Sequence, residues 1–153
     1  MTTVENARQV YARREIAADP ATIFSVLADA SKHPLIDGSG TVRGDRGQTE
    51  PLHLGSKFSM GMKIGLPYVV SNTVVEFEHD HLIAWEHFGK HRWRYTLEPV
   101  DGGTQVTETF DWSGARSPWL IEKMGYPRKH PAAMEKTLER LDHLVTTGEA
   151  PRT

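Results

Sequence analysis

The chain of 153 residues contains no cysteine. Its absence excludes disulfide bonds, thiolate nucleophiles and zinc sites that use cysteine ligands. The chain also lacks an excess of positive charge, because it has 18 lysines and arginines and 20 aspartates and glutamates, for a net charge of −2. Nucleic-acid-binding domains usually carry a basic excess. We therefore expect no nucleic-acid partner.

Long apolar runs are missing as well. No stretch approaches the roughly 20 apolar residues of a membrane-spanning helix, and residues 1–15 contain no apolar core of a signal peptide. We therefore expect a soluble, cytoplasmic protein with no membrane span. The length fits a single domain over residues 1–153, with its core at about 8–147. A domain of this size buries enough surface to need no covalent cross-links.

The N-terminal third predicts a strand followed by two short helices. Residues 8–17 suit a strand, preceded by a few loosely held residues. Asp19 and Pro20 then favour a helix start, because aspartate caps helix N-termini and proline is tolerated in the first turn. Ser31 is a candidate cap for a second helix, which Pro34 cuts short. One face of the strand carries Val10, Ala12, Arg14 and Ile16.

The middle of the chain predicts a meander of about six strands. A short strand around Thr41–Arg43 precedes five longer ones, and an Asp-Gly-Gly hairpin at residues 101–103 joins the last two. Because the connections are short, neighbouring strands must be antiparallel. The longer strands cover residues 57–65, 68–78, 82–88, 92–99 and 104–112.

The C-terminal third predicts helix. One helix can begin near Ser117, residues 125–127 interrupt it, and Pro131 restarts it. The long final helix then places apolar residues on one side at spacings of four, three and four, as expected for a helix that packs on a sheet. These residues are Met134, Leu138, Leu141 and Val145.

Three stretches carry a resemblance to a known family: residues 19–24 (DPATIF), 77–85 (FEHDHLIAW) and 102–108 (GGTQVTE). With the order of elements, they resemble the polyketide cyclase/dehydrase-like families of the START-like, or Bet v 1-like (SRPBCC), superfamily. The resemblance covers about residues 8–145. It implies an α+β helix-grip fold: a curved antiparallel sheet wrapped around a long C-terminal helix, with a cavity between them. It implies no catalytic residues, because the family has no shared catalytic motif.

Aromatic residues alternate with polar ones along the last two predicted strands. Trp93 and Tyr95 share one face, Arg92 and Arg94 the other, and Phe110 belongs to the aromatic face of the next strand. Such a face often packs as a core. Here the inward aromatic and methionine side chains are more than the apolar stripe of one helix readily covers. The pattern therefore predicts a pocket for an apolar ligand. The predicted ligand-binding residues are Met60, Met62, Trp85, His87, Trp93, Tyr95, Glu108, Phe110, Trp112 and Met134.

Glu108 is the unusual member of this inward face. A buried carboxylate is costly unless it is paired or protonated, so we expect a polar anchor with a raised pKa. The alternative is that a bulge shifts the register of the strand, or that Glu108 lies at the open end of the sheet and contacts water. His87 is a candidate partner if Ile83 and Trp85 face inward, and the opposite register buries Leu82, Ala84, Glu86 and Phe88 instead.

Three functions remain open. The first is binding of a small hydrophobic or amphipathic molecule, of lipid or polyketide-like character. The second is a cyclase or dehydrase using Glu108 and His87 as acid–base groups, although neither is committed as catalytic. The third is an interaction module that uses the outer sheet face or the helix. No metal or cofactor is expected, since His79 to His81 is typical of a surface turn. The protein is expected to be a monomer or a homodimer.

Overall fold

The computed structural model describes residues 2–4, 8–37, 42–45, 51–64, 66–87, 90–123 and 126–149. In chain order the elements are β1 (Thr2–Val4), β2 (Gln9–Ile16), α1 (Pro20–Leu27), η1 (Ala30–Lys32), α2 (His33–Ile36), β3 (Val42–Asp45), β4 (Lys57–Ile64), β5 (Leu66–Glu78), β6 (Leu82–Glu86), β7 (Arg92–Val100), β8 (Gly103–Asp111), α3 (Pro118–Lys123) and α4 (Tyr126–Thr147).

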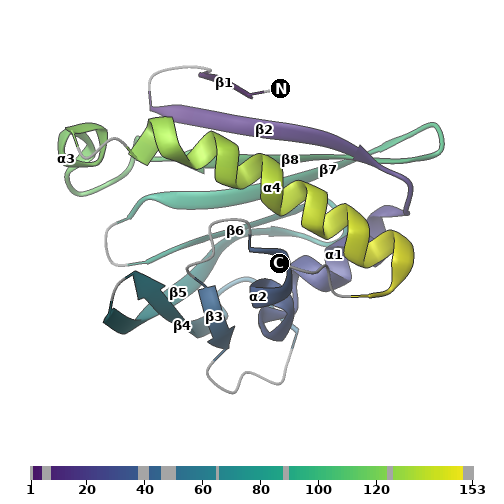
Figure 1. Cartoon of the computed structure of the whole chain (residues 1–153), viewed down its shortest axis with the longest axis horizontal. Helices are drawn as coiled ribbons and strands as arrows, with labels where there is room; N and C mark the ends of the chain where they lie inside the picture. Colours follow the sequence, from purple (N-terminus) through teal and green to yellow (C-terminus); the bar gives the residue numbers. More distant parts are fainter. Residues whose placement is uncertain are drawn as a thin grey trace.

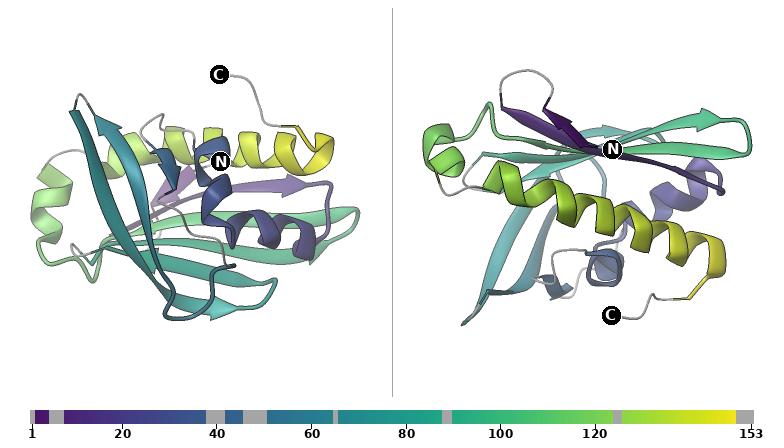
Figure 2. Two further views of the ribbon diagram at one scale, coloured as in Figure 1. Left: turned by 90° about the horizontal axis from the view of Figure 1, so that it is seen from below. Right: turned by 45° about the horizontal axis from the view of Figure 1, so that its top comes forward.

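The described strands form one antiparallel sheet in the order β1-β2-β8-β7-β6-β5-β4-β3. Strands β3 to β8 follow one another as a meander, and β2 joins the sheet beside β8. The sheet curves, and α4 lies along its inner face (Figure 1). Figure 2 shows β4 and β5 bending away from the plane of the other strands. This α+β helix-grip architecture confirms the fold predicted from the sequence.

Helix α4 packs its apolar stripe against the sheet, as predicted. Met134 and Leu138 are 1% exposed and Leu141 is fully buried, while Val145 packs at the margin of the same core. An ion pair of 2.8 Å between Arg14 Nε and Asp142 Oδ2 also joins β2 to α4. None of the helices in the described ranges is long and apolar enough to cross a membrane.

The start of α4 differs from the prediction. The helix begins at Tyr126 and runs through Pro131, instead of restarting there. A proline in a helix removes the hydrogen bond to the carbonyl four residues earlier. For Pro131 that carbonyl belongs to Pro127, the second residue of the helix. The loss is confined to the first turns, and packing of the later stripe holds the helix together.

The N-terminal elements follow the prediction with two corrections. Asp19 caps α1, because its side chain accepts a hydrogen bond of 2.7 Å from the Thr22 amide. Ser31 is not a cap: it lies inside η1, and Asp29 accepts from its amide at 3.0 Å. The first few residues, predicted to be loosely held, include Thr2–Val4, which form β1 and pair with β2.

Candidate functional site

The inner faces of β7 and β8 bring the predicted inward residues together. The register sets Tyr95 opposite Glu108 and Trp93 opposite Phe110. Tyr95 is 5% exposed, Glu108 4% and Phe110 1%. Because side chains alternate along each strand, these residues form two adjacent rows of one wall, and the expectation that Glu108 lies inside is confirmed.

Glu108 is a buried carboxyl group with incomplete hydrogen bonding. It shares a hydrogen bond with the Tyr95 side chain. Its Oε1 atom has no hydrogen-bond partner among the residues that the structure describes. Burial raises the pKa of Glu108 to about 8, the Tyr95 hydrogen bond opposes that rise, and the charge of Asp37 adds to it. Near neutral pH the group is therefore mainly a neutral acid that can donate a hydrogen bond.

Asp37, at the C-terminal end of α2, acts on this pair through its charge. Its charge raises the pKa of Glu108 and, as the smallest contribution, that of Tyr95. Burial is the main cause that raises the pKa of Tyr95, followed by the charge of Glu108. No pattern in the sequence around the end of α2 singles out Asp37.

An aromatic cluster surrounds Phe110 two residues farther along β8. Its ring centroid lies 4.7 Å from that of Trp93 and 5.6 Å from that of Trp112. Two imidazole rings join it, His91 at 5.3 Å and His130 at 4.5 Å. Trp112 is buried, whereas Trp93, His91 and His130 are only half-buried. The cluster therefore forms an apolar wall that reaches the solvent.

Histidines gather at this end of the wall. The rings of His87 and His91 are 4.0 Å apart. Burial lowers the pKa of His91 to about 4, with help from the charges of His87 and His130. Burial also lowers the pKa of His87, while Glu86 opposes the change. At neutral pH these groups are mainly uncharged, which suits an apolar site.

Sequence reasoning missed His91 and His130 as members of the site, although the signals were present. His91 is two residues before Trp93, so continued alternation places it on the same face. His130 is four residues before Met134, so helical periodicity places it on the same stripe. Within the described parts of the chain, no group of three or more histidine, aspartate or glutamate side chains is arranged to hold a metal ion.

The register of β6 is the one favoured in the sequence analysis. The Trp85 ring stacks on His33 at 4.9 Å and lies 5.7 Å from Tyr95, so it faces inward. Glu86 faces outward, where its Oε2 accepts a hydrogen bond of 3.2 Å from Arg92. His33, which also lies 5.5 Å from Phe58, is a buried part of the wall that the sequence did not single out.

The strand register separates Glu108 from His87, its candidate partner. Ile83 lies opposite Tyr95, which lies opposite Glu108. His87 is four residues beyond Ile83, which corresponds to roughly 13 Å along a strand. The chemistry of the site is therefore divided between a carboxyl–phenol centre and a separate histidine end.

The three predicted methionines have different outcomes. Met134 is 1% exposed and packs against the inner face from α4. Met60 and Met62 belong to β4, but their side chains lie outside the described residues. Their predicted contact with a ligand stays a prediction.

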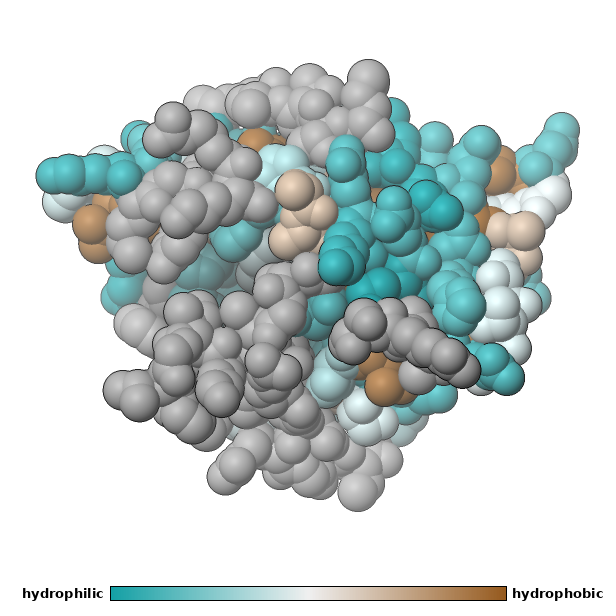
Figure 3. Space-filling view, in the orientation of Figure 1, coloured by the Kyte–Doolittle hydropathy of each residue, from teal (hydrophilic) through white to brown (hydrophobic). Residues whose placement is uncertain are grey.

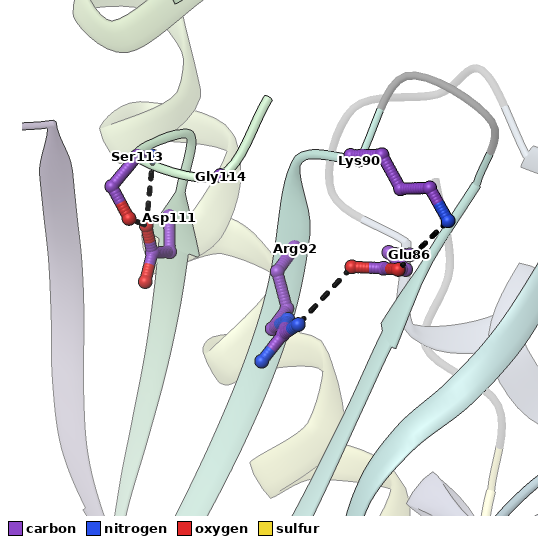
Figure 4. Close-up of a pocket in the computed structure, with 6 residues that line it drawn as sticks. All are labelled: Glu86, Lys90, Arg92, Asp111, Ser113 and Gly114. Atoms are coloured by element: carbon purple, nitrogen blue, oxygen red, sulfur yellow. Dashed lines mark hydrogen bonds and ion pairs between the residues drawn. The ribbon is translucent and has the colours of Figure 1, made fainter. Parts of the chain in front are cut away.

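The outer face of the same strands carries an ion-pair network. Glu76 accepts hydrogen bonds from Arg92 and from Arg94, the latter at 2.8 and 2.7 Å. A polar pocket beside the network presents both signs of charge, and its charged side chains largely bond to one another (Figure 4). Mutual pairing is typical of a structural surface. The pocket is lined by Glu86, Lys90, Arg92, Asp111, Ser113 and Gly114.

Comparison with known proteins identifies the family. Residues 7–146 match the model of the family described as polyketide cyclase / dehydrase and lipid transport. The chain belongs to this family. It is thereby a member of the SRPBCC, or Bet v 1-like, superfamily.

Individual relatives extend the comparison. An uncharacterized protein of Mycobacterium tuberculosis is 39% identical over 142 residues, covering 89% of this chain and 63% of its own length. A Rhodobacter sphaeroides crystal structure is similar with a TM-score of 0.73 and 18% identity, covering 97% of this chain and 99% of that one. A polyketide-cyclase-like protein of Corynebacterium glutamicum, solved by NMR, is similar with a TM-score of 0.62 and 16% identity, covering 94% of this chain and 95% of that one. At these identities the solved structures show the shared fold. The chain spans less than two thirds of the M. tuberculosis relative.

Proposed function

We propose that this protein binds a small hydrophobic or amphipathic molecule, of lipid or polyketide-like character, against the inner face of its sheet. The observation that carries the proposal is Glu108. Buried polar atoms in native proteins nearly always have hydrogen-bond partners, yet one carboxyl oxygen of this buried residue has none among the described residues. A ligand oxygen facing the neutral acid supplies the missing partner.

The surroundings of Glu108 support an apolar ligand with a few polar atoms. Tyr95 provides a hydroxyl group at the same level of the sheet. Trp85, Trp93 and the ring of Phe110 provide a continuous apolar surface. An apolar lining with a small number of fixed polar groups is typical of small-molecule sites. The half-buried histidine end offers the way in from solvent.

A second candidate is catalysis of cyclisation or dehydration. The raised pKa of Glu108 favours it, because a carboxyl group that stays protonated near neutral pH can act as a general acid. His87, one residue past the end of β6, lies too far from Glu108 to act as its base. Tyr95 is the group opposite Glu108 in the sheet, and Asp37 acts on Glu108 through its charge. In this case Glu108→Gln abolishes turnover while ligand binding persists. If the protein only binds, no turnover is seen with either form.

Native mass spectrometry of gently purified protein tests the binding proposal first. We expect a bound small molecule as a mass adduct that denaturation releases. Titration with the apolar fluorescent probe 1-anilinonaphthalene-8-sulfonate follows, for which we expect micromolar affinity, about −8 kcal/mol.

Two tryptophan substitutions on one strand provide a matched comparison for the titration. Phe110→Trp adds volume on the inner face and is expected to weaken probe binding at least tenfold. Thr109→Trp adds volume on the other face of β8 and is expected to leave it unchanged. Thermal melts verify that both variants fold. An absence of probe binding, or equal binding by both variants, contradicts the proposal.

A further inference from the structure

Helix α3 presents two large apolar side chains to solvent. Trp119 is 62% exposed and Leu120 is 43% exposed. The helix projects at one end of the molecule, beyond the end of the sheet (Figures 1 and 2). Figure 3 shows hydrophobic surface at that end, on a face that is otherwise largely polar where it is described. Exposed tryptophan and leucine side by side are unusual on a surface with no apolar partner.

The exposure is fixed by contacts on the other side of α3. Ile121 packs against the hydrophobic core. The Glu122 Oε2 atom accepts hydrogen bonds of 2.7 Å from the Trp112 indole and 3.2 Å from Arg8 Nε. These contacts tie the helix to β2 and to the end of β8, so Trp119 and Leu120 are held outward.

The sequence in and just after α3 is rich in basic residues, although the whole chain has a net charge of −2. Residues 116–129 contain four basic residues and one acidic residue. The acidic one, Glu122, is already paired with Arg8. Arg116 and Lys123 are exposed, one on either side of the apolar pair in the sequence.

We infer that α3 docks the protein on an anionic lipid surface. Tryptophan and leucine beside basic residues form the pattern of helices that lie in the headgroup region of a membrane, and each basic residue near an anionic surface adds attraction. A second copy of the chain is the weaker candidate. A specific protein interface buries roughly 1,000 Å² or more, whereas one tryptophan and one leucine, both partly covered, offer only a few hundred.

Vesicle sedimentation tests this inference. The probes are vesicles of pure phosphatidylcholine and vesicles containing 30% phosphatidylglycerol. We expect the wild type to sediment with the anionic vesicles, to sediment far less with the neutral ones, and to be released by 0.5 M NaCl. The double variant Trp119→Ala/Leu120→Ala is expected to lose at least tenfold in vesicle affinity. Lys123→Glu is expected to lose severalfold.

Leu54 provides the matched control. It is 61% exposed, and it lies in the segment that leads into β4, away from the residues that hold α3. Leu54→Ala is expected to bind vesicles like the wild type. An equal loss in Leu54→Ala, or no binding of the wild type to anionic vesicles, overturns the inference. A wild-type dimer that the double variant dissociates overturns it as well, in favour of a second copy.

Membrane docking goes beyond the proposed ligand binding, and the two can fail separately. The double variant keeps the whole inner wall, so its affinity for the fluorescent probe without vesicles is expected to stay at the wild-type value. Loss of probe binding in the wild type leaves the vesicle result standing, and the reverse also holds.

Discussion

Two glutamates on opposite faces of the sheet have opposite protonation behaviour. Glu76 lies on the outer face of β5, where hydrogen bonds from Arg94 and Arg92 lower its pKa against the effect of burial. Glu108 lies on the inner face of β8, where burial raises its pKa to about 8 and Tyr95 is its hydrogen-bond partner. Both residues are glutamates, so their surroundings decide whether the carboxyl group is ionised or protonated near neutral pH.

The same contrast extends along both faces. The outer face stabilises charges by pairing them, which is inexpensive where water is close. The inner face removes water, so charge is penalised there and both the carboxyl group and the imidazoles tend to be neutral. A neutral interior with a few hydrogen-bonding groups fits the amphipathic ligand that we propose.

Phe110→Ala is the largest expected perturbation of this contrast. Phe110 is 1% exposed and central to the aromatic cluster, so its truncation is expected to cost about 3–5 kcal/mol of unfolding free energy. Urea denaturation at pH 7 measures the loss. The neighbouring outer-face substitution Thr109→Ala is expected to cost about 0.5 kcal/mol, and similar losses for the two contradict the assignment of faces.

Glu108→Gln tests the protonation of the inner carboxyl group. Because its folded pKa of about 8 exceeds the ordinary value of 4.5, the wild type is favoured at low pH and loses stability as pH rises between these two values. The glutamine variant has no such loss. Relative to wild type it is expected to gain about 2–4 kcal/mol at pH 8 and almost nothing at pH 4.5.

Unfolding free energies at several pH values check this expectation for Glu108. Glu98→Gln, on the exposed side of β7, serves as the control and is expected to follow the wild type throughout. Parallel curves for Glu108→Gln and wild type contradict a buried neutral carboxyl group.

His91→Phe tests the other end of the wall. Its pKa is lowered from 6.5 to about 4, so the fold resists protonation and the wild type loses stability as pH falls from 6.5 towards 4. Phenylalanine removes this dependence. Between pH 7 and pH 4 the variant is expected to lose about 2 kcal/mol less than wild type. His53→Phe, at an exposed position, is expected to show no such protection, and an unchanged pH profile for His91→Phe rules out the effect.

Glu76→Gln is the smallest expected effect. The lowered pKa means that the ion pairs stabilise the fold above the ordinary value of 4.5 and lose this contribution as pH falls through the lowered one. Because the network is partly exposed to water, we expect a loss of about 1 kcal/mol at pH 7 that shrinks as the pH falls below 4.5. Glu78→Gln, exposed two residues farther along β5, is the control for this measurement.

The sequence by itself determined the order of elements and the face of most side chains. Alternation in residues 92–99 and 104–112 predicted that Tyr95 and Glu108 lie inside, and periodicity predicted the buried stripe of α4. These are local patterns, set by the geometry of one strand or one helix. The family resemblance correctly implied how the sheet and the helix pack.

Only the tertiary structure decided which side chains meet. Strand register set Glu108 opposite Tyr95 instead of beside His87, and the fold lets the charge of Asp37, at the end of α2, act on the pKa of Glu108. Packing of α4 added His130 to a cluster formed by His91 and Phe110. Contacts between elements distant in sequence depend on loop paths and on packing across the whole sheet, and no local period encodes them. The exposure of Trp119 has the same origin. Arg8 and Trp112, which lie outside α3, donate hydrogen bonds to Glu122 and so hold the helix in its orientation.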